Sequence, residues 1–364
     1  MSFSIVDVFP IALLALLIYG IRLRRPLHEF NTDTYLSVET CKSFRGLLAI
    51  IVVLHHLAQN TVNDSIYSYI ISDGFLVVAF FFFLSGYGLQ SSYISKGDKY
   101  KKGFILKRIP PVLIPYIIIT VLYWLMYLAG GDLYTLKDII IGIVKGNTIV
   151  PYSWYIVNIL EFYIIYWLLM IICKKNYALM IAGALIWYIL YAAFCMRMSY
   201  GVWWYKTSLL PAVGMFWATY EKRIIEIVKR RYFIITPIVF TALLLLVFWQ
   251  SDTIPFIVPI AKSSLFIVIS KGILFVICVL MFSMKFQIGN KALRFLGEIS
   301  LEIYLSQGLF IKLLRSDWVY IGNDFLRFLA VLTLTIVFSF FLHKAFRFIL
   351  KKNELLMRNK VRAG

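Results

Sequence analysis

Long apolar runs separated by short polar segments dominate the pattern of this chain. Runs of about 20 residues with few charges are typical of transmembrane helices. Eleven such runs are predicted to span a membrane: residues 3–21, 44–60, 73–94, 109–129, 153–173, 177–195, 203–219, 232–250, 263–284, 295–315 and 324–350. The pattern therefore predicts an all-α, polytopic membrane protein, and a shorter apolar segment, 136–144, is expected to be an interfacial or re-entrant helix.

Lysine and arginine are distributed unevenly among the segments between these runs. Residues 22–43, 95–108 and 220–231 are rich in them, whereas 61–72 and 316–323 contain none. Rich and poor segments alternate as eleven spans require, and basic loops face the cytoplasm. We therefore expect a protein of the cytoplasmic (inner) membrane with its N-terminus outside and its C-terminus inside.

Composition supports this class and argues against others. The chain is 61% hydrophobic and only 15% charged, and its mean hydropathy is +0.83, unlike a soluble domain. The net charge of +19 does not indicate a nucleic-acid partner, because the basic residues lie in short loops between apolar runs. None of the four cysteines forms a CxxC pair, so neither a disulfide framework nor a metal site is expected.

The second predicted span carries two residues that are unusual inside a membrane. It reads FRGLLAIIVVLHHLAQN and contains Arg45 and His56. Eleven helical residues turn through about 1100°, so Arg45 and His56 share one face, about 16 Å apart along the axis. His55 lies about 80° off that face. Because charged or titratable groups within a membrane are costly, they usually face a functional interior.

Several stretches together resemble the acyltransferase-3 family of integral-membrane acyltransferases. The arginine and histidine of the second span, with ten residues between them, are the first element of this resemblance. The others follow in the family's order across roughly residues 40–350: GFLVVAFFFFLSGYGL (74–89), KRIPPVLIPY (107–116), SWYIVNILEFYIIYWLL (153–169) and LGEISLEIYLSQGLF (296–310).

The chain departs from the family pattern at two positions. Ile105 stands where many relatives have an arginine three residues before that of the Arg-x-x-Pro element, and Gln307 stands where the late motif often has a histidine. The family core usually has ten helices. The resemblance thus implies three parts: a helix and linker in 1–40, an acyltransferase-3-like domain in 41–350, and a basic cytoplasmic tail in 351–364.

The resemblance implies transfer of an acyl group, commonly acetyl, from cytoplasmic acyl-CoA. The acceptor would be a hydroxyl of a cell-envelope glycan or of a lipid-linked sugar. A hydroxyl is a weak nucleophile, and a histidine, with an unperturbed pKa of about 6.5, suits the role of general base. His56 is the candidate base, and Glu161 and Glu302, which lie inside spans, are candidates to orient it, to pair with a cation or to be protonated.

Other residues are candidates for binding. Arg45, Lys107 and Arg108 are expected to hold the phosphates of the donor, since arginine forks suit phosphate. Ser85, Trp154 and Tyr163 are candidate substrate contacts. Structural roles are the alternatives: a histidine bonded to a helix carbonyl, arginines that only mark topology, and a Ser85–Gly86 pair that lets helices approach.

We therefore expect a membrane O-acyltransferase with acyl-CoA, most simply acetyl-CoA, as donor and no metal. Its partners would be membrane lipids and the glycan acceptor, and the oligomeric state is open. The alternative is an exporter or flippase of a glycan or lipid-linked sugar. Such carriers more often show internal repeats with matched broken helices, and no such repeat is recognisable here.

Overall fold

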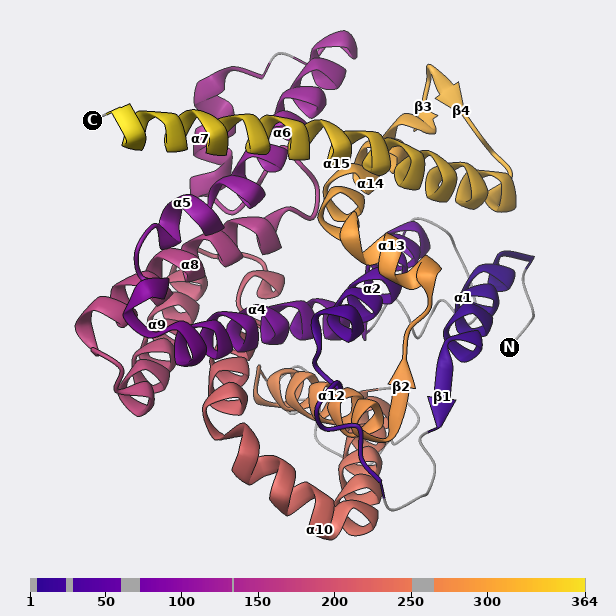
Figure 1. Cartoon of the computed structure of the whole chain (residues 1–364). Coiled ribbons are helices and arrows are strands. Elements are labelled where there is room, and N and C mark those ends of the chain that lie inside the picture. The colour runs from indigo at the N-terminus through magenta and orange to yellow at the C-terminus, as the bar shows by residue number, and fades with distance from the viewer. Residues whose placement is uncertain (1–4, 24–28, 60–72, 133, 251–264, 364) are drawn as a thin grey trace.

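The computed structural model describes the chain except for residues 1–4, 24–28, 60–72, 133, 251–264 and 364 (Figure 1). Helices account for most of the described chain, with two short strand pairs. The elements are η1 (Ile5–Asp7), α1 (Val8–Tyr19), β1 (Ile21–Leu23), α2 (Val38–Ala58), α4 (Phe75–Lys96), η2 (Gly97–Tyr100), α5 (Phe104–Arg108), α6 (Pro110–Ala129), α7 (Leu136–Val144), α8 (Trp154–Ile172), α9 (Tyr177–Arg197), η3 (Val202–Trp204), α10 (Leu210–Gln250), α12 (Leu265–Lys285), β2 (Phe286–Ile288), α13 (Lys291–Glu298), α14 (Ser300–Leu313), β3 (Arg315–Ser316), β4 (Val319–Tyr320) and α15 (Asp324–Ala363).

Within the described residues, eight helices are long and apolar enough to cross a membrane. They are α2, α4, α6, α8, α9, α10, α12 and α15. The prediction of an all-α, multi-pass membrane protein is confirmed. The first predicted span is shorter than expected, because the apolar helix there covers only Ile5–Tyr19.

The seventh and eighth predicted spans both fall in α10, which consists of two helices joined at a kink, because Arg231 has non-helical geometry (φ −125°, ψ 23°). The segment expected as a loop, 220–231, is helical up to this kink. This segment contains no glycine or proline, and Glu226 and Arg230 form an i,i+4 ion pair of 2.8 Å. Good helix formers with such pairing extend a helix beyond the membrane. Figure 1 shows the two arms of α10 meeting at an angle.

The tenth predicted span is divided into α13 and α14. Ile299 (φ −103°, ψ 14°) separates them, and the Ser300 hydroxyl donates to the carbonyl of Gly297 over 3.0 Å. A serine that bonds a nearby carbonyl competes with helical hydrogen bonding. Residues 351–363, expected to be a separate tail, instead continue α15 as helix.

Glycines allow two pairs of helices to meet backbone to backbone. A Cβ atom on Gly46 of α2 would lie 2.0 Å from the carbonyl oxygen of Leu293, and one on Gly297 would lie 1.8 Å from that of Lys42. The same holds where α4 meets α10, since a Cβ on Gly86 would lie 1.9 Å from the Pro211 oxygen. Small residues at such crossings permit the close approach that packs membrane helices.

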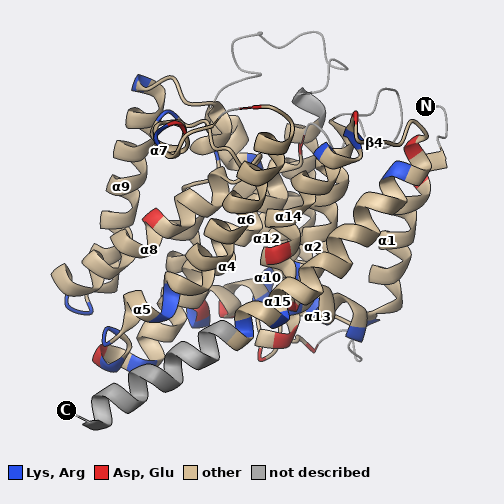
Figure 2. Ribbon diagram, turned by 90° about the horizontal axis from the view of Figure 1, so that it is seen from above, with Lys and Arg blue, Asp and Glu red and all other residues tan. Residues whose placement is uncertain are grey.

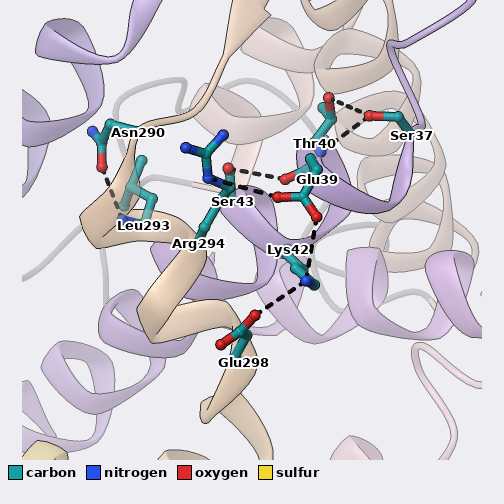
Figure 3. Close-up of polar contacts among 9 residues, drawn as sticks. All are labelled: Ser37, Glu39, Thr40, Lys42, Ser43, Asn290, Leu293, Arg294 and Glu298. Atoms are coloured by element: carbon teal, nitrogen blue, oxygen red, sulfur yellow. Dashed lines mark hydrogen bonds and ion pairs between the residues drawn. The ribbon is translucent and has the colours of Figure 1, made fainter.

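Polar contacts hold the first turns of α2 against α13 (Figure 3). Ser37 caps α2 by accepting from the Thr40 backbone, and Asn290 caps α13. Lys42 bridges Glu39 at 3.2 Å and Glu298 at 3.1 Å. Exposed ion pairs contribute little energy. These contacts instead fix the position of the first turn of α2 relative to α13. Helix α2 carries Arg45 and His56.

Charged residues gather toward the two ends of the bundle, with a largely uncharged band between them (Figure 2). We name the ends after elements that mark them: the α7 end, where α7 and β4 lie, and the α5 end, where α5 and α13 lie. Helix α2 starts against α13, so Arg45 lies nearer the α5 end and His56 nearer the α7 end.

Candidate active site

His56 lies in the wall of a cavity of about 490 Å³ at the α7 end. Its side chain is buried, and its ring stacks on that of Tyr152 with centroids 3.6 Å apart and planes tilted by 11°. Gln307 lies near the imidazole, and its amide nitrogen donates to the Tyr304 carbonyl over 3.1 Å. His55 lines the same cavity, with Nε2 3.0 Å from the Gln59 amide nitrogen. The two adjacent histidines therefore line the same cavity but contact different neighbours.

The backbone that presents Tyr152 is unusual. Tyr152 has φ +66°, a left-handed conformation that residues other than glycine rarely adopt. Its carbonyl accepts a hydrogen bond from the Tyr304 hydroxyl. Such conformations persist where surrounding contacts hold them, and they are common at functional sites. The loop before α8 therefore keeps an aromatic ring flat against His56.

A second cavity, of about 540 Å³, contains four of the predicted binding residues. Arg45, Ser85, Arg108 and Tyr163 all line it, although they come from four different helices. No acidic residue occurs among its described lining residues. The Nε of Arg45 is buried without a hydrogen-bond acceptor within the described chain. A buried polar atom without a partner is costly, and two arginines without a carboxylate in the wall favour an anionic ligand.

A third cavity, of about 530 Å³, opens at the α5 end. Lys96, Lys99, Lys107 and Arg108 line it together with aromatic residues. Arg108 donates to the Tyr100 hydroxyl over 2.7 Å, and its guanidinium lies 5.7 Å from the centre of that ring. The predicted donor residues Lys107 and Arg108 therefore face a cationic, partly aromatic recess.

The three cavities lie in a row, because each shares a lining residue with the next. Arg108 lines both the second and the third, and Tyr304 lines both the first and the second. The row thus runs from a cluster of cations at the α5 end to His56 near the α7 end. A ligand that touched both ends would have to be long, since Arg45 and His56 alone are about 16 Å apart along α2.

The structure does not bring the two predicted carboxylates to His56. Neither Glu161 nor Glu302 is among the described residues that line the His56 cavity. Glu302 pairs instead with His343, at 2.8 Å between Oε1 and Nδ1. Glu161 lies on α8 beside Trp187 of α9. The hypothesis that either orients His56 thus lacks support from the geometry, and Gln307 takes the neighbouring place.

Trp154 is the one predicted substrate residue in the His56 cavity; Ser85 and Tyr163 lie in the second. Reasoning from the sequence missed Tyr152, Tyr304 and Lys206, which also line the first cavity. Tyr304 had a visible signal, as it is the tyrosine of the late motif. Tyr152 and Lys206 had none, because their roles depend on contacts between segments far apart in the chain.

Comparison with known proteins defines the class of this molecule. A family model described as an acyltransferase domain matches residues 42–344, which is most of the chain. The protein therefore belongs to the acyltransferase-3 family, and it is a multi-pass membrane acyltransferase. No curated protein and no solved structure matches the chain.

Proposed function

We propose that this protein is a membrane O-acyltransferase that moves an acyl group, acetyl in the simplest case, from cytoplasmic acyl-CoA to a hydroxyl of a cell-envelope glycan or lipid-linked sugar. The observation that carries the proposal is the row of cavities: cations line one end of it and His56 the other. Family membership favours this function over a glycan exporter.

The cationic end suits the phosphates of CoA. Lys107 and Arg108 would hold phosphate at the outer cavity, and Arg45 would bind further in. Charge-assisted hydrogen bonds from arginine forks are strong and directional. The α5 end would then face the cytoplasm, where acyl-CoA is found, in agreement with the excess of basic loops expected there. The arm that carries the thioester would extend through the second cavity toward Tyr304.

The histidine end suits proton transfer. The acceptor hydroxyl would attack the thioester carbonyl while its proton passes to a ring nitrogen of His56. As the tetrahedral intermediate collapses, the carbon–sulfur bond breaks and the ester remains on the acceptor. The proton held by His56 then reaches the departing CoA sulfur, so that free thiol is released. The stacked Tyr152 ring would hold the imidazole in place during both transfers.

The decisive test is thiol release from acetyl-CoA by the purified protein in detergent, with an envelope glycan fraction as acceptor. We expect release that depends on the acceptor and is lost in His56→Ala. Comparing the masses of envelope glycans from wild-type and deletion strains would identify the acceptor. Normal thiol release in His56→Ala would exclude the proposed base, and a wild type that moves glycan without releasing thiol would favour the exporter.

A further inference from the structure

A lysine lies in the same cavity as the proposed base. Lys206, between η3 and α10, lines the His56 cavity and is partly buried, with its ammonium 4.5 Å from the centre of the Phe75 ring. Among the described lining residues it is the only lysine or arginine, and none of them is acidic. The cavity near the proposed base therefore has a cation in its wall.

The charge of Lys206 is not matched by a partner of its own. The nearby carboxylate, Asp73, forms an ion pair with the fully buried Lys271. Lys206 forms no ion pair within the described chain, although Asp73 is close enough to influence its charge. Burial lowers the pKa of Lys206 to about 8, and Lys271 adds to this while Asp73 opposes it. Lys206 is still mainly charged at neutral pH, so an entering anion would supply the missing counter-charge.

The rest of the wall suits a sugar. Trp154, Trp203 and Trp204 line the cavity with Tyr152, and Asn147 adds an amide. Flat aromatic faces pack against the apolar faces of sugar rings, while amides bond their hydroxyls. A volume of about 490 Å³ falls within the range of small-ligand pockets. The geometry thus combines a surface for a ring, a single cation and a histidine.

We propose that the acceptor in the His56 cavity is an anionic sugar, whose carboxylate or phosphate binds Lys206 while one of its hydroxyls faces His56. The second half of this statement rests on the proposed acyl transfer; the binding of the anion to Lys206 does not. The shared chemistry is a negatively charged group on the sugar ring. A uronic-acid carboxylate and a sugar phosphate are its two sources, and the experiment separates them.

The test measures binding without any acyl donor. Methyl glucoside, methyl glucuronide and methyl glucoside 6-phosphate are titrated into purified protein, with quenching of tryptophan fluorescence as readout. We expect at least one charged glycoside to bind about tenfold or more tightly than the neutral one, as loss of a hydrogen bond to a charged group predicts. The tighter of the two charged probes identifies the source of the anion.

Three variants define the role of Lys206. Lys206→Met should remove the preference for charge, and Lys206→Arg should keep most of it. Lys145→Met is the matched control, because Lys145 is exposed and close to the cavity rim but does not line it. The control should behave as wild type. If Lys206→Met fails to fold, increasing KCl should still weaken the charged glycosides and leave the neutral one unchanged in wild type.

Absence of a charge preference in wild type, including no binding of any probe, would overturn the proposal. So would a preference that survives in Lys206→Met or disappears equally in Lys145→Met. These results are separable from the proposed function. Charge-dependent binding without thiol release would uphold the anion site and reject acyl transfer. Transfer to neutral sugars alone would uphold acyl transfer and reject the anion site.

Discussion

The two ends of the cavity row differ in how they present positive charge. At the α5 end, lysines and Arg108 line an open recess, and Arg45 lies further in, so several cations share one region. At the α7 end, a single lysine stands among aromatic rings beside two histidines. Many shared cations suit a ligand with several phosphates, and one cation among rings suits a sugar with a single charge. This difference is why the proposed function places the donor at the α5 end and the acceptor at the α7 end.

The comparison depends on the two ends facing opposite sides of the membrane. We expect a reporter fused at Gly131, after α6, to read as external and one fused at Gly97, after α4, to read as cytoplasmic, because basic loops remain inside. Alkaline phosphatase and green fluorescent protein fusions give this all-or-none result. If both positions read as the same side, the assignment of donor and acceptor to opposite sides would fail.

Removal of the base should have the largest effect on rate. His56→Ala should lower acyl transfer by about 10²- to 10⁴-fold, the usual contribution of a general base, and leave donor affinity nearly unchanged. His55→Ala is the matched control and should be much milder, since His56 shares the helix face of Arg45 and stacks on Tyr152 at 3.6 Å. Steady-state rates and donor affinities of both variants provide the measurement. An inactive His55→Ala with an active His56→Ala would reassign the base.

Arginine variants test the proposed donor site, toward the α5 end of the cavity row. Arg45→Ala should weaken binding of a non-hydrolysable acyl-CoA analogue by about 10- to 150-fold, which corresponds to about 1.5–3 kcal/mol for one charge-assisted hydrogen bond. Arg45→Lys should recover only part, because lysine lacks the planar fork. Arg230→Ala, an exposed arginine paired with Glu226, is the control. Unchanged affinity in Arg45→Ala would leave this residue as a topology marker.

Arg108→Ala should have a smaller effect than Arg45→Ala on the same titration. Three lysines line the outer cavity with Arg108 and can also contact the phosphates of the donor: Lys96, Lys99 and Lys107. The double variant Arg45→Ala with Arg108→Ala should bind the analogue more weakly than either single variant. Wild-type affinity in the double variant would refute the donor site.

The weakest expected effect is a dependence on pH at the α7 end. The preference for a charged glycoside should decrease as pH rises through about 8, where Lys206 loses its proton. Asp73 and Lys271 lie near Lys206, and His55 and His56 share its cavity. Binding titrations from pH 7 to 9 test this. A constant preference would assign the selectivity to another group.

Local patterns indicate residues that the structure brings together. Arg45, Ser85, Arg108 and Tyr163 are predicted binding residues from motifs on four separate helices, and they line one cavity. The sequence leaves the partners of buried carboxylates open. Glu302 is a candidate to orient His56, to pair with a cation or to be protonated, and the structure pairs it with His343, 41 positions away in sequence. A buried carboxylate needs a partner, and only packing decides which one it meets.

The sequence by itself determined the helical class and most helix positions, because the apolar length of each segment and its hydrogen bonding are local properties. It also determined that Arg45 and His56 share a face. Only the tertiary structure decided that Tyr152 covers His56 and that Tyr304 lines two cavities. These features arise from contacts between distant segments, where the close approach of helices at Gly46 and Gly86 sets what each side chain meets.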